Sequence, residues 1–320
     1  MFVSVLISTR NRASSLRQTL ESLFHPANLE SSDWEVVVID NDSDDNTSEV
    51  CRDFRERFSQ HFRFLGEKKR GKSNALNTAI AAAKGDVLAF TDDDVLCAPD
   101  FLKAIRSVFD EYAPDGVQGR VLLDCKGGWP EWLDSHLALT VAFRDCGDDV
   151  IELQGTLFGC NMVVRAEVFR KIGGFSPELG PGAIGLAEDT ELTFRMRQDG
   201  CRLIYAPQIV VRHQLSRDRL TKSFLRERFF QNGRAEAYFA PLPVPLWRFG
   251  LYVAKEWVLK EPEALWHLCA GRPALALLRQ CEVYSWAGFF WQHWCFKRGI
   301  ACQLSVNLLS CSTAEVRSQK

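Results

Sequence analysis

The amino-acid sequence predicts an α/β protein, with a largely parallel β-sheet covered by helices on both faces and a helical region after it. Up to about residue 110, short apolar runs alternate with segments of helical periodicity. The net charge has opposite signs in two parts of the chain. Residues 1–220 carry 26 Lys and Arg against 34 Asp and Glu, whereas residues 221–320 carry 13 Lys and Arg against 7 Asp and Glu. Six of the nine Trp also lie in residues 221–320. We therefore expect an α/β domain over residues 1–220 and a helical region over residues 221–320.

Three runs of strand length are apolar almost throughout, as expected for strands that are buried on both faces. They cover residues 2–8, 35–40 and 86–91, and the short stretch 63–65 is a candidate for a further strand. Helical spacing of apolar residues, or a good helix-forming composition, marks the segments that follow them. These segments are residues 14–24, 50–58, 73–84 and 100–109. Strands that alternate with helices in this way form parallel sheets with helices on both faces.

The pattern changes after about residue 116. Further strands are expected over residues 117–123, 156–164 and 202–212, and helices over residues 129–139 and 187–198. From about residue 220 the sequence is helical and rich in tryptophan, with one interruption by the proline-rich segment 240–245.

Composition excludes several classes of protein. Hydrophobic residues make up 46% of the chain and charged residues 25%, which excludes general disorder. A formal net charge of −2 argues against a surface that binds nucleic acid, so we expect no nucleic-acid partner. Eleven cysteines without a C-x-x-C pair, and a start unlike a secretory signal, favour reduced thiols and a cytoplasmic location. No stretch reaches the roughly 18 apolar residues of a membrane-spanning helix.

Polar side chains gather where the predicted strands end. Thr9 and Arg10 follow the first strand, Asp40 and Asp42 the second, and an aspartate triplet the fourth. The basic run 68–72 precedes the helix over residues 73–84. Because ligands of open parallel sheets bind beyond the carboxyl ends of the strands, these groups are candidates for one site. Solvated turns use the same residue types, and for the group after the second strand that interpretation is equally good.

The triplet Asp92-Asp93-Asp94 is the strongest single signal. Three adjacent carboxylates after a buried strand repel one another, and unpaired burial of any of them is costly. Mg²⁺ and Mn²⁺ accept such oxygen ligands, and Mg²⁺ is often held by one or two carboxylates together with substrate phosphates. With the basic run 68–72 available for an anion, the pattern suggests a metal–diphosphate site. A solvated acidic turn is the alternative.

Seven motifs occur in the order found in inverting glycosyltransferases of family 2, which have the GT-A fold. They are VSVLISTRNR, VVVIDNDSDDNT, RGKSNALNTAI, GDVLAFTDDDV, FGCNMVVRAEVFRKIGGF, GLAEDTELTFRMRQDGCRLIYAP and VVRH. The chain resembles this family over about residues 1–220. The resemblance implies a Rossmann-like mixed sheet flanked by helices, a nucleoside-diphosphate sugar as donor, and Mn²⁺ or Mg²⁺ as cofactor.

By the resemblance, the nucleotide and the metal bind at the strand ends. The nucleotide-binding residues it implies are Thr9, Arg10, Asp40, Asp42, Arg70, Lys72, Asp92 and Asp93. Asp92 and Asp94 match the outer acids of the D-x-D motif. Asp94 would ligate the metal directly, Asp92 would reach the ribose or a metal-bound water, and His213 would complete the metal ligands.

A second acidic pair lies at the start of the helix over residues 187–198. Acids at a helix N-terminus are common because they favour the helix dipole, so this pair has an ordinary structural explanation. By resemblance, however, Asp189 is the base that deprotonates the acceptor hydroxyl, with Glu188 as its rival. The turn Gly159-Cys160-Asn161 would approach the donor sugar, although Cys160 replaces the small residue commonly found there.

The sequence thus predicts metal-dependent inverting transfer of one sugar to a hydroxyl of a glycan or a lipid-linked acceptor. Processive relatives carry Q-x-x-R-W, and the nearest match, Gln231 to Arg234, lacks the Trp. Residues 221–300 either pack as ordinary helices or contact the cytoplasmic face of a membrane peripherally. Two other functions are open: a sugar nucleotidyltransferase, which would usually carry a G-x-G-T-R loop, and a non-catalytic module that binds nucleotide sugars.

Overall fold

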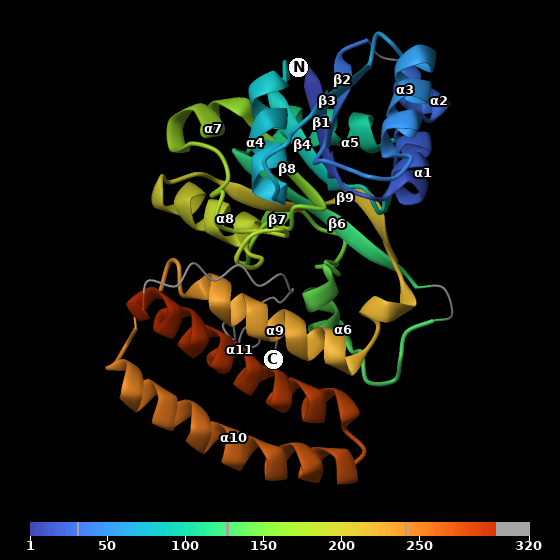
Figure 1. Ribbon diagram of the computed structural model, residues 1–320. Helices are drawn as coiled ribbons and strands as arrows, with labels where there is room; N and C mark the ends of the chain where they lie inside the picture. The colour runs from blue at the N-terminus through green and yellow to red at the C-terminus, as the bar shows by residue number, and fades with distance from the viewer. Residues whose placement is uncertain (31, 126–127, 241, 299–320) are drawn as a thin grey trace. The chain divides into compact units, whose positions relative to one another are not determined.

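The computed structural model describes residues 1–30, 32–125, 128–240 and 242–298 (Figure 1). The chain forms two compact units. The first comprises Met1–Asp124, Arg144–Pro177 and Glu188–Gln214, and the second comprises Cys125–Phe143, Glu178–Ala187 and the chain from Leu215 onward. The second unit thus takes two short segments from the part before residue 220. That residues 1–220 act as a catalytic domain stays a prediction.

One mixed sheet organises the first unit. Its strands are β1 (Val3–Thr9), β2 (Trp34–Asp40), β3 (Phe62–Gly66), β4 (Val87–Asp92), β5 (Val95–Cys97), β6 (Gly116–Cys125), β7 (Ile151–Glu152), β8 (Asn161–Arg165) and β9 (Leu203–Leu215). The order is β3-β2-β1-β4-β8-β6-β9-β5, and β7 pairs with β9. Strands β3, β2, β1 and β4 are parallel, whereas β8 is antiparallel to both β4 and β6.

The register of the parallel strands brings their carboxyl ends to one edge. Thr9 pairs with Asp40, and Asp40 pairs with Gly66 on its other side. Ser8 pairs with Asp92 across β1 and β4. The polar segments that follow these strands therefore begin from neighbouring positions, as we expected.

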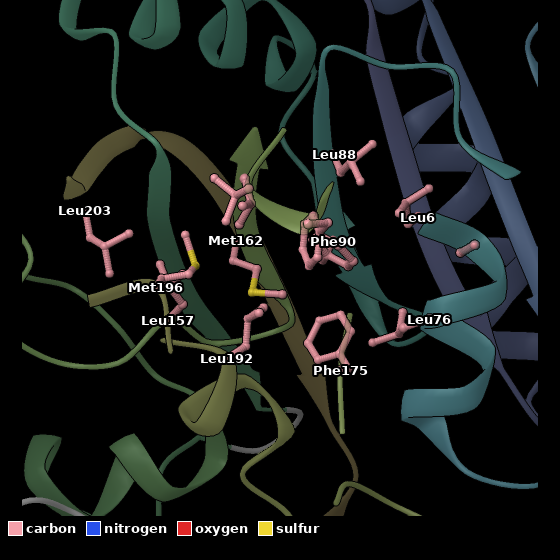
Figure 2. Close-up of a cluster of buried hydrophobic side chains, with 14 of the residues drawn as sticks. Leu6, Leu76, Leu88, Phe90, Leu157, Met162, Phe175, Leu192, Met196 and Leu203 are labelled. Atoms are coloured by element: carbon pink, nitrogen blue, oxygen red, sulfur yellow. The ribbon is translucent and has the colours of Figure 1, made fainter. Parts of the chain in front are cut away.

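Helices cover both faces of this sheet. They are α1 (Ala13–Leu23), α2 (Pro26–Leu29), α3 (Thr47–Arg57), α4 (Lys72–Ala82), α5 (Phe101–Tyr112), α7 (Ala166–Ile172) and α8 (Glu188–Gln198). Figure 2 shows the core in which Leu76 of α4 and Leu192 of α8 meet Phe90 of β4. Side chains of a strand alternate between the two faces of the sheet. Val37 of β2 therefore points into this core, whereas Trp34, three residues earlier on the same strand, points to the opposite face.

The opposite face of β2 and β3 packs on aromatic rings. Phe24, at the end of α1, lies 5.2 Å from Trp34 and 5.7 Å from Phe54 of α3, centroid to centroid. Phe54 lies 6.1 Å from Phe62 of β3. This second layer holds α1 and α3 against the sheet, and so positions the loops that lead into both helices.

Some predicted elements differ from the observed ones. The strand expected over residues 156–164 begins only at Asn161, after a turn. The helix expected over residues 129–139 is reduced to α6 (Ser135–Ala138) and η1 (Leu139–Val141). The N–H of Leu133 donates to the carbonyl oxygen of Pro130 in a turn, and the carboxylate of Asp134 then accepts from the N–H of Leu137, so the helix begins after Asp134. The three-residue strand β5 was not predicted, because only its pairing with β9 defines it.

Three long helices dominate the second unit: α9 (Lys222–Glu236), α10 (Leu246–Cys269) and α11 (Pro273–Arg298), with the short helix η2 (Arg217–Arg219) before them. α11 packs against both α9 and α10 (Figure 1). At the crossing of α9 and α11, a Cβ on Gly233 would lie 1.7 Å from the carbonyl oxygen of Ser285. In the described residues, no helix has the length and apolarity that crossing a membrane requires.

Candidate active site

Lys72 joins the acids at the end of β4 to those at the start of α8. Its Nζ lies 2.6 Å from Oδ1 of Asp92 and 3.5 Å from Oε1 of Glu188. Burial would lower the pKa of Lys72, but the charges of Asp92 and Glu188 outweigh burial and raise that pKa above its ordinary value. The ammonium group is therefore charged, and it ties two acidic segments that lie 96 residues apart in the sequence.

Arg12 pairs with the other two aspartates of the triplet. Its Nη1 lies 2.6 Å from Oδ2 of Asp94 and 3.0 Å from Oδ1 of Asp93. Burial raises the pKa of Asp93 to about 6, although Arg12 opposes that shift and the charge of Asp94 adds to it. Arg12 was not among the predicted site residues, although it belongs to the motif VSVLISTRNR. Two side-chain cations, Arg12 and Lys72, thus balance the repulsion within the triplet.

The pairing of β5 with β9 brings His213 to the triplet. Val95 pairs with His213, and the backbone N–H of Gln214 donates to the carbonyl oxygen of Asp94. Nε2 of His213 lies 3.3 Å from Oδ1 of Asp94, and both side chains are nearly buried. Of the three predicted metal ligands, the structure thus brings Asp94 and His213 together, whereas Asp92 contacts Lys72.

The donor atoms suit a divalent cation in kind. Asp94 offers carboxylate oxygen and His213 offers imidazole nitrogen. Because Mg²⁺ prefers oxygen ligands, a set that includes imidazole fits Mn²⁺ better. Within residues 1–30, 32–125, 128–240 and 242–298, no three or more side chains of His, Cys, Asp and Glu are gathered as they would be around an ion. That Asp92, Asp94 and His213 share a metal stays a prediction.

The acidic pair of α8 lies at the same place. Oδ2 of Asp189 accepts a hydrogen bond of 3.0 Å from the backbone N–H of Gly159, and its Oδ1 accepts one of 2.8 Å from the N–H of Thr190. Burial raises the pKa of Asp189, against the effect of these hydrogen bonds and of Lys72. Burial also raises the pKa of Glu188 to about 7. Both carboxyl groups are therefore better proton acceptors than exposed acids.

The loop that contains the basic run is fixed by Asn41, which the sequence analysis did not single out. Nδ2 of Asn41 donates to the carbonyl oxygens of Glu67 and Lys69, at 2.9 Å each. Its Oδ1 accepts from the N–H of Gly71, which has a φ of 121°. The side chain is 5% exposed, so these bonds form away from water. In the sequence, the only signal is an asparagine directly after a predicted strand, and its burial is known from the structure alone.

The remaining predicted nucleotide residues lie around this loop. Nη2 of Arg70 lies 3.6 Å from Oδ2 of Asp42, and Nε of Arg10 donates to the carbonyl oxygen of Asp42. Asp40 accepts from the N–H of Ser43, which shapes the turn after β2. Thr9, at the end of β1, is buried. Asp42 thus contacts both Arg10 and Arg70, and all three residues are solvent-exposed, a position open to a ligand.

The predicted donor-sugar turn contacts Asp189 through its first residue only. The side chain of Cys160 is buried, and burial raises the pKa of its thiol well above the ordinary value. Nδ2 of Asn161 donates to the backbone carbonyl oxygens of Arg120 and Ile209, 2.9 Å away in each case. This amide therefore serves to join β8 to β6 and β9. A contact of Cys160 or Asn161 with a sugar stays a prediction.

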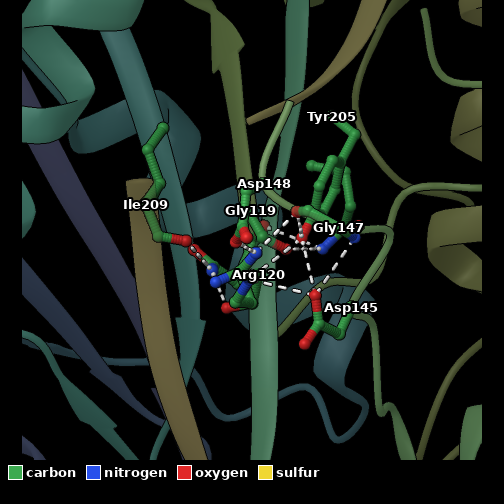
Figure 3. A network of polar contacts seen from close by, with 9 residues as sticks. Gly119, Arg120, Asp145, Gly147, Asp148, Tyr205 and Ile209 are labelled. Atoms are coloured by element: carbon green, nitrogen blue, oxygen red, sulfur yellow. Dashed lines mark hydrogen bonds and ion pairs between the residues drawn. The ribbon is translucent and has the colours of Figure 1, made fainter. Parts of the chain in front are cut away.

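A polar network around Arg120 lies next to that amide (Figure 3). Arg120 lies 3.1 Å from Asp145 and 2.7 Å from Asp148, and it donates to the hydroxyl of Tyr205 at 3.2 Å. The network holds the loop over residues 145–148 against β6 and β9. It orders the sheet beside the predicted donor-sugar turn, and its two carboxylates are paired with Arg120.

Comparison with known proteins gives the family. The sequence model described as Glycosyl transferase family 2 matches residues 4–173, more than half of the chain. The chain belongs to glycosyltransferase family 2. The matched region of this family 2 chain includes Lys72, the aspartate triplet and Gly159, whereas Glu188, Asp189 and His213 lie beyond it.

Two relatives of the family 2 chain come from Haloferax volcanii. Glycosyltransferase AglE is 27% identical over 66% of this chain and 66% of its own length. A glucosyl-dolichyl phosphate glucuronosyltransferase is 27% identical over 73% of this chain and 75% of its own length. The chain spans between 42% and 66% of the length of the first four curated relatives that it matches.

A solved structure confirms the fold. The mannosyltransferase PcManGT from Pyrobaculum calidifontis, determined in complex with GDP-Man and Mn²⁺, superposes with a TM-score of 0.60 at 21% identity. The superposition covers 91% of this chain and 87% of that one. The expected α/β fold of GT-A type, with a mixed sheet and a C-terminal helical region, is therefore confirmed.

Proposed function

We propose that this family 2 chain transfers one sugar residue from a nucleoside-diphosphate sugar to a hydroxyl group, with inversion at the anomeric carbon. The observation that carries the proposal is the position of Lys72, within 2.6 Å of Asp92 and 3.5 Å of Glu188. Through it, the acids at the strand ends and the acids of α8 belong to one site. One acidic segment can then serve the leaving group while the other serves the acceptor.

The leaving-group side comprises the strand ends. Thr9 and Asp40 would hold the nucleotide base, and Arg70 would lie near the base or the phosphates. A divalent cation would be held by Asp94 and His213, with Asp92 directed to the ribose or a water ligand. When bound, such an ion stabilises the negative charge that develops on a departing diphosphate. Because Asp94 also binds Arg12, the ion would share that carboxylate with the guanidinium group.

On the acceptor side, Asp189 is the proposed base. Its two backbone hydrogen bonds fix the carboxylate in one orientation, and burial raises its pKa, which makes it a stronger base than an exposed aspartate. Attack by the deprotonated hydroxyl from the side opposite the diphosphate inverts the anomeric carbon. Glu188 is the acid of the pair whose carboxylate contacts Lys72 directly, so we assign it the supporting role.

The proposed acceptor is a glycan or a lipid-linked sugar. A lipid-linked acceptor is supported by the relative whose name gives glucosyl-dolichyl phosphate as its substrate. A peripheral contact of residues 221–300 with the cytoplasmic face of a membrane would agree with such an acceptor. Gln231 and Arg234 are hydrogen-bonded at 2.7 Å and buried, and the motif they form lacks its Trp, which supports transfer of a single residue and not processive synthesis.

The proposal is tested by hydrolysis of donors in the absence of acceptor. UDP-, dTDP- and GDP-sugars are incubated with the chain and either Mn²⁺ or Mg²⁺, and the nucleotide products are separated by chromatography. We expect release of a nucleoside diphosphate with one donor class, and we expect Asp94→Ala to abolish it. Asp189→Asn should lower transfer to an acceptor by about 10²–10⁴-fold while donor binding, measured by calorimetry, is retained.

The matched control is Asp53→Asn, because Asp53 of α3 is a partly exposed aspartate that forms ion pairs with Arg17 of α1 and Arg57 of α3. It should leave both activities unchanged. Unchanged hydrolysis in Asp94→Ala would contradict the metal assignment. Release of pyrophosphate would identify a nucleotidyltransferase instead, and unchanged properties of Asp189→Asn would favour a module that only binds nucleotide sugars.

A further inference from the structure

Helix α10 exposes an apolar stripe along its length. Nine of the 18 large apolar side chains exposed in the described residues lie on this one helix. The most exposed are Trp247 and Leu251, at 64% each, Val258 at 70%, Leu265 at 61% and Trp266 at 59%. We call these five residues the outer face. The spacing 247, 251, 258 and 265 places four of them on one side of an α-helix.

The opposite side of α10 packs against α11. Phe249 is buried, and its ring lies 5.4 Å from the ring of Phe289. Acidic side chains of α10 turn to the same side: Glu263 lies 2.9 Å from Arg279, and Glu261 accepts a hydrogen bond from a glutamine of α11. Glu261 and Glu263 are thus paired with side chains of α11, whereas the five residues of the outer face stay exposed.

Positive charge borders the outer face. The guanidinium group of Arg248 lies 5.1 Å from the ring centre of Trp247, and that of Arg272 lies 5.8 Å from Trp266. Lys255 is exposed between them. Trp247 and Trp266 are 19 residues apart, which is about 28 Å along a helix axis. The outer face is thus a long apolar strip with a basic margin and a tryptophan near each end.

We propose that the outer face of α10 lies flat on the surface of an anionic lipid membrane. Apolar and aromatic side chains would enter the boundary between headgroups and acyl chains, where Trp is favoured, and Arg248, Lys255 and Arg272 would meet lipid phosphates. A second copy of the chain is a poorer occupant. A two-fold interface places like patches together, so it would bring these basic groups near one another while the acids face α11.

This inference does not rest on the proposed glycosyl transfer, and its test needs neither donor nor metal. The full chain is mixed with vesicles of phosphatidylcholine alone, or with about one third phosphatidylglycerol, and binding is measured by flotation. Each basic side chain near an anionic surface contributes about fivefold to binding. We expect at least tenfold tighter binding to the anionic vesicles, and a loss of at least tenfold in the variant Trp247→Ser, Leu251→Ser, Val258→Ser.

The matched control is Leu29→Ser, Leu65→Ser, Ile151→Ser, because these three apolar residues are exposed elsewhere. It should bind vesicles as the wild-type chain does. Circular dichroism confirms that each variant is folded. Arg248→Glu with Lys255→Glu should remove the preference for anionic vesicles, which separates the electrostatic part from the apolar part.

Four results would overturn the proposal. The first is absence of binding by the folded wild-type chain to either vesicle, and the second is equal binding by the wild-type chain and the outer-face variant. Another is a wild-type chain that is dimeric without vesicles and becomes monomeric in that variant, which would assign the face to a second copy. The fourth is binding that occurs only after residues 299–320 are removed, which would identify that segment as the cover of the face.

Discussion

At the scale of single residues, the charges of the site are balanced by two side chains. Lys72 contacts Asp92 and Glu188, and Arg12 contacts Asp93 and Asp94. Repulsion within an aspartate triplet therefore does not by itself require a metal ion. What supports a metal is the addition of His213 to Asp94, which places imidazole nitrogen beside carboxylate oxygen.

Glu188 should make stability depend on pH. Burial raises its pKa from 4.5 to about 7, so the folded chain keeps a proton that the unfolded chain releases in this range. The contribution of Glu188 to the free energy of unfolding is therefore complete below pH 4.5, and it is lost as the pH rises to about 7. We expect the unfolding free energy of the wild-type chain, relative to Glu188→Gln, to fall by up to about 3 kcal/mol over that range.

The measurement is urea unfolding of both chains at several pH values, without metal or donor. The glutamine variant keeps the shape of the side chain but has no titrating proton, so it is the reference for the wild-type chain at each pH. A constant difference between the two chains across pH 4.5–7 would show that Glu188 has an ordinary pKa.

At the scale of elements, two glycines set how closely α9 and α11 pack. A Cβ on Gly233 would lie 1.7 Å from the carbonyl oxygen of Ser285, and one on Gly288 would lie 1.8 Å from that of Phe230. Each glycine thus faces the backbone of the other helix. Backbone cannot move aside as a flexible side chain can, so the helices would have to separate.

Either Gly233→Ala or Gly288→Ala should therefore destabilise the second unit. We expect a loss of about 3 kcal/mol or more in unfolding free energy, at or beyond the upper end of ordinary overpacking. Far-UV circular dichroism during urea unfolding measures it. Gly66→Ala is the control, because a Cβ there meets nothing within 4 Å, and its effect should stay within about 0.5 kcal/mol. Equal effects at all three positions would mean that the close approach of the two helix backbones does not cause the loss of stability.

At the scale of the whole molecule, charge is divided along the chain. Residues 221–320 have a net charge of +6 and residues 1–220 a net charge of −8. The basic part contains the outer face of α10, so its attraction to anionic lipid should be screened by salt. The acidic part contains the proposed catalytic residues. Electrostatic attraction to the membrane and the proposed glycosyl transfer would then belong to different parts of one chain.

Binding to anionic vesicles should consequently weaken by at least tenfold when salt is raised from 0.1 to 1 M, because the screening length falls from about 10 Å to about 3 Å. Residual binding through the apolar stripe should remain and should match the level of the Arg248→Glu, Lys255→Glu variant. Flotation at a series of salt concentrations measures both. Affinity that is independent of salt would remove the electrostatic part of the membrane proposal.

Local patterns in the sequence determined the parallel half of the sheet, its helices, and the presence of acids at the strand ends, since periodicity and apolar runs depend on neighbouring residues. The family followed from seven ordered motifs. Local patterns did not predict every element. β5 is defined only by its pairing with β9, and the helix expected over residues 129–139 is much shorter in the structure.

Only the tertiary structure decided which polar groups meet. Lys72 contacts an acid 20 residues away and another 116 residues away, and the partners of Arg12 lie 81 and 82 residues away. Asn41 fixes the basic loop by hydrogen bonds that no motif suggested. The exposed side of α10 is likewise set by where α11 packs. The physical reason is common to all: periodicity records the surroundings of a residue within one element, whereas ion pairs and exposed faces depend on which elements pack together.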